Sequence, residues 1–331
     1  MGKEYLLEVK DLSVYYETDE GTAKAVNNLD IQLEKGKTLG LVGETGSGKT
    51  TTALAMIRLV PDPPGVIKSG EIILDGMDIF KLSEKEMDTL VRGTNVSMIF
   101  QDPMTSLNPV MTVGYQIAET IKIHQKISND EAEKKAEEML ELVGIPAARS
   151  KEFPHQFSGG MKQRVIIAIA LACNPKLLIA DEPTTALDVT IQAQVLETMK
   201  NLKDKFGMAM IMITHDLGIV AEVCDEVSVI YAGRIVEHGE IREVFKNTLH
   251  PYTEGLFGSL PRINDNREML MPIPGLMPDP MDLPSGCAFS PRCKYATISC
   301  SKTIPKKKYI TETHYVACIA YDDPEFKLKG V

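Results

Sequence analysis

Long apolar runs are missing from this chain of 331 residues. The longest, Val165–Cys173 and Met208–Ile213, fall well short of the ~20 apolar residues that cross a bilayer. The first residues, MGKEYLLEVKDL, also lack the basic head, apolar stretch and cleavage site of an export signal. We therefore expect a cytosolic chain that does not itself span a membrane.

An excess of positive charge is missing as well. The chain has 46 acidic and 36 basic residues, for a net charge of -10. A surface of this sign repels phosphate backbones, so we do not expect nucleic acid as a partner. The length allows one large domain and a smaller appendage, because single cores rarely grow past roughly 250 to 300 residues.

Cysteines are few, and their spacing matches no standard metal motif. Four of the six lie in the last 45 residues with the spacing C-x5-C-x6-C-x17-C, which differs from tight zinc pairs and from ferredoxin runs. The surrounding segment is rich in proline and has little core of its own, so we expect a bound metal to stabilise it, although the spacing does not identify which metal. The four residues are Cys287, Cys293, Cys300 and Cys318. Cys173 and Cys224 lie in apolar predicted helices and are expected to be buried packing residues.

Predicted strands and helices alternate along most of the chain. Antiparallel strands are expected from Leu6 to about Leu33, and a hairpin is expected around Asp75-Gly76. The pattern is helical between Met111 and Val143, where Ser128 with an acid three residues on predicts a capped helix start. Alternation resumes at Lys176, which predicts a largely parallel sheet with a helical insertion.

A phosphate-binding motif lies between a predicted strand and a predicted helix. GETGSGKT fits G-x-x-x-x-G-K-[ST] in full, and the Lys-Thr ending with these flanks disfavours a chance glycine-rich turn. Lys49 is expected to reach the terminal phosphates and Thr50 to hold magnesium. The predicted nucleotide-binding residues here are Gly43, Glu44, Thr45, Gly46, Ser47, Gly48, Lys49, Thr50 and Thr51.

Two adjacent acids follow the apolar run LLIA. Asp181 emerges where the predicted strand ends and can order the magnesium shell, and Glu182 can orient and polarise an attacking water. Alone, such a pair is usually a solvated loop; together with the phosphate-binding motif, the functional interpretation is favoured.

A second glycine pair, in FSGGMKQR, precedes another predicted helix.

These motifs resemble the ATP-binding cassette family over nearly the whole chain. The resemblance implies a Walker A motif at 43–50, a Walker B motif at Leu177–Asp181 and a catalytic glutamate at Glu182. It also implies a switch histidine at His215 and a Q-loop glutamine at Gln101 that contacts magnesium.

The resemblance also implies a role for the second glycine pair. FSGGMKQR is similar to the LSGGQ signature, with phenylalanine and methionine in place of leucine and glutamine. In this family Ser158, Gly159 and Gly160 would reach the γ-phosphate bound by another copy, so ATP joins two subunits head to tail. The remaining implied nucleotide contacts are the D-loop residue Asp188 and an adenine-stacking aromatic at Tyr16, with Tyr15 as the competing choice.

The implied fold class is α/β. A P-loop NTPase core of the RecA-like type would carry an antiparallel β subdomain, an inserted helical subdomain at about 102–165 and an irregular cysteine-containing extension. The expected domains are 1–250, binding nucleotide, and 251–331, the extension.

Several stretches, among them QDPMTSLNP and HPYT, resemble the ATP-binding subunits of dipeptide and oligopeptide importers. That resemblance implies ATP and Mg²⁺ as cofactors and a 4Fe-4S cluster on the four clustered cysteines, with zinc and unlinked thiols as the alternatives. The implied partners are two integral membrane permease subunits, a second identical or related ATPase, and indirectly an extracytoplasmic peptide-binding protein. The implied location is the cytoplasmic face of the membrane.

Two rival functions fit the sequence less well. A soluble cassette ATPase with a non-transport role would usually show coiled-coil insertions, a duplicated cassette or no cysteine-bearing tail. A P-loop kinase would leave FSGGMKQR unexplained.

Overall fold

The computed structural model describes residues 4–102, 106–185, 187–259 and 273–328. Parts of the predicted helical insertion and of the predicted extension lie outside these ranges. The chain forms two compact units. One comprises Met1–Leu7, Gln32–Thr38 and Ile73–Ile213, and the other comprises Glu8–Ile31, Leu39–Ile72 and Thr214–Val331.

The first unit contains a parallel sheet in the order β8-β7-β6. Its strands are Val96–Ile99 (β6), Leu177–Asp181 (β7) and Ala209–Thr214 (β8). Every residue of β7 and β8 is buried, as expected of strands whose two faces are both covered. These strands confirm the parallel sheet predicted from the apolar runs.

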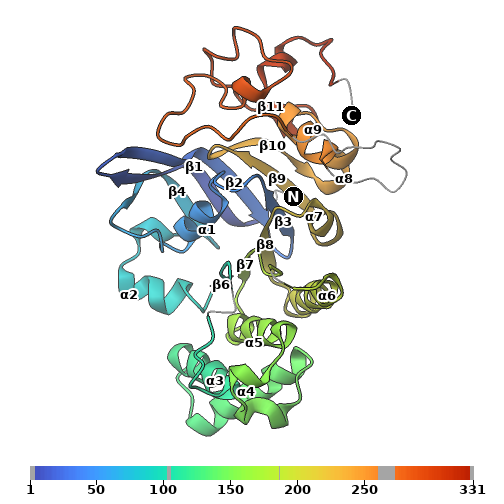
Figure 1. Ribbon diagram of the computed structural model, residues 1–331. Coiled ribbons are helices and arrows are strands. Elements are labelled where there is room, and N and C mark those ends of the chain that lie inside the picture. Colours follow the sequence, from blue (N-terminus) through green and yellow to red (C-terminus); the bar gives the residue numbers. More distant parts are fainter. Residues whose placement is uncertain (1–3, 103–105, 186, 260–272, 329–331) are drawn as a thin grey trace. The chain divides into compact units, whose positions relative to one another are not determined.

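Helices of the first unit form a bundle beyond β6. α3 (Val113–His124), α4 (Asn129–Leu142) and α5 (Gly159–Leu171) pack against one another (Figure 1), and α5 also contacts β6 and α6 (Val189–Phe206). The predicted start of α4 is confirmed, because the Ser128 hydroxyl accepts from the Glu131 N–H at 3.3 Å.

Four strands form a second sheet in the order β2-β1-β4-β5. The predicted hairpin is present: Leu74 pairs with Met77 across Asp75 and Gly76, whose φ values are +45° and +82°. Positive φ at both central residues is the conformation of the tight turns that match strand twist. The bounds are Tyr5–Thr18 (β1), Gly21–Glu34 (β2), Gly65–Leu74 (β4) and Met77–Asp78 (β5), followed by the short helix α2 (Glu84–Glu86).

The second unit is built on strands in the order β11-β12-β10-β9-β3. β3 and β9 are parallel, and the other pairs are antiparallel. The strands are Thr38–Val42 (β3), Glu226–Tyr231 (β9), Arg234–Glu240 (β10), Lys308–Tyr309 (β11) and Tyr315–Val316 (β12). The helices are Lys49–Met56 (α1), Leu217–Val223 (α7), Ile241–Lys246 (α8) and Pro251–Gly258 (α9).

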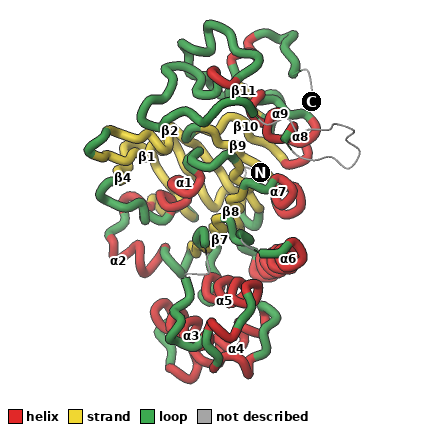
Figure 2. Tube along the Cα trace, in the orientation of Figure 1, coloured by secondary structure: helices red, strands yellow, loops and turns green. Residues whose placement is uncertain are grey.

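The described chain after α9 is almost entirely loop (Figure 2). It is attached to the second unit by the β10–β12 pairing and by a hydrogen bond from the Lys24 N–H to the Pro280 carbonyl at 2.8 Å. The irregular extension predicted from the proline density is therefore present. Among the described helices, none is long and apolar enough to span a bilayer.

Candidate functional site

The glycine loop follows the fully buried strand β3 and leads into α1. A side chain at Gly43 would place its Cβ 2.3 Å from the Ile230 carbonyl oxygen, and one at Gly48 would lie 2.4 Å from the Ala25 oxygen. Gly48 is the residue before α1 and has a φ of +104°, which other residues rarely adopt. Packing and backbone conformation therefore require glycine here, and the first N–H groups of a helix, which lack intrahelical acceptors, are a common place for an anion to bind.

The lysine of the loop is turned back onto its own backbone. Lys49 Nζ donates to the carbonyl oxygens of Gly43 at 2.8 Å and Glu44 at 2.9 Å, and the residue is 7% exposed. These neutral acceptors hold the ammonium group at the loop, and an anionic acceptor would bind it more strongly.

An aromatic side chain lies beside the start of α1. The Tyr16 hydroxyl and the Thr51 hydroxyl are 3.3 Å apart, so Tyr16 is the tyrosine placed against the helix that carries Thr50. Neighbouring residues of a strand point to opposite faces, so Tyr15 faces away.

Gln101 and Glu182, 81 residues apart in sequence, meet at one edge of the parallel sheet. They follow β6 and β7, which pair in register through Ile99 and Ala180, so both chains leave the sheet on the same side. Gln101 Nε2 donates to Glu182 Oε2 at 3.2 Å, and the Thr185 hydroxyl donates to the same oxygen at 3.2 Å. The two hydrogen bonds orient the carboxylate.

Glu182 has the left-handed backbone conformation, with a φ of +48°. For a residue with a Cβ this costs about 1–3 kcal/mol, and such strain concentrates at functional positions. The preceding Asp181 is 1% exposed and ends β7, so the two adjacent acids have different environments. His215 directly follows β8 and is exposed, and Asp188 is the exposed residue that precedes α6.

The second glycine pair opens α5. Ser158 is exposed and makes no side-chain capping hydrogen bond among the described residues, and the first N–H groups of a helix have no intrahelical acceptor. A Cβ at Gly160 would lie 2.3 Å from Ile191 Cγ2. Phe157 is 5% exposed and packs under Arg149, whose guanidinium carbon lies 4.3 Å from the ring centroid. The aromatic ring thus fills a core position that leucine occupies in the family pattern.

The four clustered cysteines are free thiols of intermediate exposure. Burial raises the pKa of Cys293 to about 11 and that of Cys318 to about 12, and the charges of the other clustered thiols add to both. No group of three or more His, Cys, Asp or Glu side chains within the described ranges is arranged to hold a metal ion. A metal cluster therefore does not fit this arrangement of the thiols.

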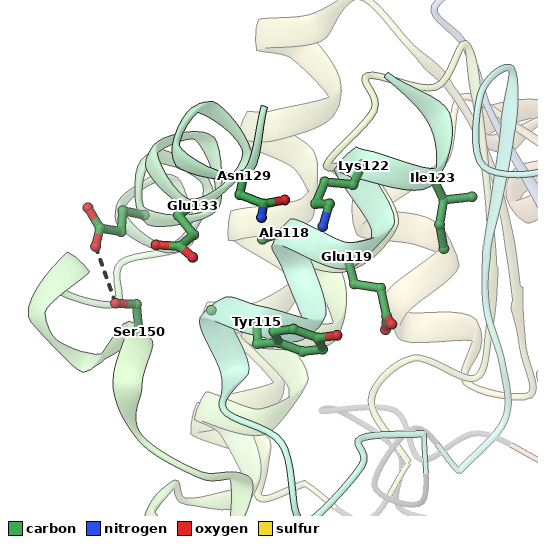
Figure 3. Close-up of a pocket in the computed structure, with 10 residues that line it drawn as sticks. Tyr115, Ala118, Glu119, Lys122, Ile123, Asn129, Glu133 and Ser150 are labelled. Carbon is green, nitrogen blue, oxygen red and sulfur yellow. Dashed lines mark hydrogen bonds between the residues drawn. The ribbon is translucent and has the colours of Figure 1, made fainter. Parts of the chain in front are cut away.

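A groove of about 490 Å³ lies between α3 and α4 (Figure 3). Tyr115 and Ile123 on α3 are 51% and 71% exposed and give it an apolar wall. Glutamates outnumber lysines around it. Its lining residues are Gly114, Tyr115, Ala118, Glu119, Lys122, Ile123, Asn129, Glu133, Glu137 and Ser150.

Two residues outside the sequence predictions contact the glycine loop. The Glu44 N–H donates to the Tyr252 hydroxyl at 2.8 Å, and Arg292 Nη1 donates to Glu44 Oε2 at 3.0 Å. Both lie more than 200 residues from the loop, and neither belongs to a phosphate-binding motif. The occurrence of Tyr252 inside HPYT was the one sequence feature that could have drawn attention to it.

The strand, glycine loop and helix, with an oriented glutamate at a sheet edge, define the class of P-loop ATPases. A profile of the ABC transporter family matches residues 26–185, and a profile described as the oligopeptide/dipeptide transporter C-terminal region matches residues 236–300. The chain belongs to the ATP-binding cassette transporter family and is an ATPase.

Individual relatives narrow the branch. The chain is 54% identical to the oligopeptide transport ATP-binding protein OppD of Bacillus subtilis strain 168, over 94% of this chain and 87% of that protein. It is 46% identical to the dipeptide transport ATP-binding protein DppD of the same strain, over 96% of each chain. A dimeric, post-hydrolysis structure of the ATP-binding cassette MJ0796 with ADP and Pi is similar with a TM-score of 0.63 and 25% identity, over 71% of this chain and 99% of that one.

These comparisons confirm the predicted family and fold class. The match to the peptide-transporter C-terminal region favours the importer branch over the soluble, non-transport alternative. The individual site residues stay predictions.

Proposed function

We propose that this protein is the ATP-hydrolysing subunit of a membrane transporter that imports dipeptides or oligopeptides. It would work at the cytoplasmic face of the membrane, bound to two permease subunits and paired with a second ATPase. Residues 1–250 would bind nucleotide and residues 251–331 would form the extension. The observation that carries the proposal is the Gln101–Glu182 contact, 3.2 Å long, in a chain that also has the peptide-transporter C-terminal region.

The proposed roles follow from the placement of each side chain. Lys49 would exchange its two carbonyl acceptors for the terminal phosphates, and Thr50 would hold magnesium. Magnesium, when bound, would neutralise charge on the β- and γ-phosphates. Asp181 and Gln101 would complete its ligand shell, and Tyr16 would stack on adenine.

Hydrolysis would depend on Glu182 and on a second subunit. The Glu182 carboxylate, held by Gln101 and Thr185, would accept a proton from the attacking water. His215 would donate to the γ-phosphate. The exposed Ser158 hydroxyl and the N–H groups of Gly159 and Gly160 would bind the γ-phosphate held by the other subunit, and Asp188 would be the D-loop residue. ATP would then stabilise the closed pair, and hydrolysis would reopen it.

The groove between α3 and α4 would receive a short cytoplasmic helix of the permease. The incoming helix would bury the exposed Tyr115 and Ile123, which form the apolar wall of the groove. The glutamates around the groove would favour basic residues on that helix. Figure 3 shows Glu133 on α4 and Glu119 on α3 at this groove. The Ile123→Glu change should weaken co-purification with the permease pair while the isolated subunit still binds ATP.

The four thiols of the extension would hold an iron–sulfur cluster, or zinc as the alternative, after rearranging from the positions described here. The support is the match of the peptide-transporter C-terminal region to residues 236–300, which include Cys287, Cys293 and Cys300, together with the free state of all four thiols. Iron, sulfide and zinc analysis of anaerobically purified protein tests this proposal. Protein without any bound metal would refute it.

Reconstitution with the candidate permease pair in vesicles tests the function itself. We expect peptide uptake only when ATP is present on the side of the membrane to which this subunit binds. We also expect the permease to stimulate its ATPase activity. An ATPase that co-purifies with no integral membrane protein and is stimulated by none would contradict the proposal.

A further inference from the structure

The carboxy-terminal extension reaches the phosphate-binding loop through a buried arginine. Arg292 lies in the loop-rich chain after α9, and its side chain is 6% exposed. Its Nη1 donates to Glu44 Oε2 at 3.0 Å, which joins residues 248 positions apart. This charge-assisted hydrogen bond is part-buried, since the Glu44 side chain is 28% exposed, and it is stronger than a hydrogen bond between neutral groups.

Glu44 is held at three different atoms. Its N–H donates to the Tyr252 hydroxyl at 2.8 Å, its carbonyl oxygen accepts from Lys49 Nζ at 2.9 Å, and its carboxylate accepts from Arg292. The other carboxylate oxygen, Oε1, is buried without a hydrogen-bond partner in the described structure. Arg292 is therefore the cation that compensates this carboxylate.

The two residues that hold Glu44 from outside the loop are themselves fixed. Arg292 Nε donates to the Pro274 carbonyl at 2.9 Å, so the guanidinium is oriented by the extension. Tyr252 is fully buried, and its ring centroid lies 4.6 Å from that of Tyr231 and 5.4 Å from that of Phe289. Phe289 belongs to the same segment as Arg292, so one segment of the extension supports both contacts to Glu44.

We propose that Arg292 and Tyr252 are positioning residues for the phosphate-binding loop, and that the extension thereby sets the affinity for ATP. Lys49 must leave the Glu44 carbonyl to reach the phosphates, which leaves that carbonyl with the Ser47 N–H at 3.2 Å. The contacts from Arg292 and Tyr252 then keep the loop in its binding shape, so less conformational freedom is lost when ATP binds. This inference rests on the proposed assignment of residues 43–50 as the phosphate-binding loop.

The test is equilibrium titration of the full-length protein with a fluorescent ATP analogue and Mg²⁺. Arg292→Met should raise the Kd by about 10-fold or more, the scale of a lost charge-assisted hydrogen bond. Arg292→Lys should recover part of the affinity. Tyr252→Phe, which removes only the hydroxyl, should raise the Kd several-fold.

A double-mutant cycle identifies the route of the effect. Because Arg292 is proposed to act through the Glu44 carboxylate, Glu44→Gln combined with Arg292→Met should bind no more weakly than Arg292→Met alone. Lys307→Met is the matched control, since Lys307 is another cation of the extension and pairs with Asp30 rather than with the loop. Its Kd should equal that of the unmodified protein.

Thermal unfolding separates positioning from a merely structural role. If Arg292→Met or Tyr252→Phe lowers the Tm while the folded protein binds the analogue with unchanged Kd, the inference is overturned. If Arg292→Met does not fold, the Kd values of Arg292→Lys and Tyr252→Phe test the inference instead. Normal binding by Lys49→Ala would refute the loop assignment itself. Loss of binding in Lys49→Ala with normal binding in the Arg292 and Tyr252 variants would refute this inference alone.

Discussion

Replacing Glu182 by glutamine tests its proposed role as the base that activates water. The substitution keeps an oxygen acceptor for the Gln101 amide and the Thr185 hydroxyl, both 3.2 Å from Oε2, so the local geometry should persist. What disappears is the ability to accept a proton. Loss of a positioned general base lowers turnover by about 10²–10⁴-fold, which corresponds to roughly 3–5 kcal/mol in activation free energy.

ATP binding, unlike turnover, should not be weakened by the substitution. The amide carries no charge, so it does not repel the terminal phosphates, and Glu182→Gln should retain ATP and accumulate as a dimer. The assays are phosphate release at saturating ATP and size-exclusion chromatography with bound nucleotide. Glu197→Gln is the matched control, because Glu197 is an exposed carboxylate on α6 and should leave both unchanged. Turnover of Glu182→Gln within about twofold of the unmodified protein would refute the assignment.

The remaining predictions concern binding and stability. Lys49→Ala should weaken ATP binding by about 100-fold, measured by calorimetry, because an ammonium group paired with phosphate is lost. Ser128→Ala should lower the free energy of unfolding by about 1 kcal/mol in urea titrations, because a helix cap is removed. Burial lowers the pKa of His250 from 6.5 to about 3. As the pH drops below 6.5, the unfolded chain therefore binds a proton at His250 before the folded chain does. The free energy of unfolding should then decrease by up to roughly 1.4 kcal/mol for each pH unit. His250→Asn, which keeps a cap for α9, should flatten that slope between pH 6.5 and 5, and an equal slope would contradict the reasoning.

Local patterns in the sequence determined most of the secondary structure and the position of the glycine loop. The apolar runs at β7 and β8, the Asp75-Gly76 turn and the Ser128 cap were all predicted, because each depends on residues close together in the chain. The glycine motif was recognisable for the same reason, since its eight residues are consecutive in the chain.

Contacts between distant segments were decided only by the tertiary structure. The family resemblance named Gln101 and Glu182, but their hydrogen bond exists because β6 and β7 are adjacent in one parallel sheet. Nothing near Arg292 in the sequence identifies Glu44 as its partner. The extension is mostly loop, and loop conformation follows from packing against the rest of the unit rather than from a repeating pattern of side chains. The sequence alone therefore determined the elements with local patterns. The tertiary structure, by bringing together residues more than 200 positions apart, decided that Tyr252 and Arg292 contact Glu44 of the glycine loop.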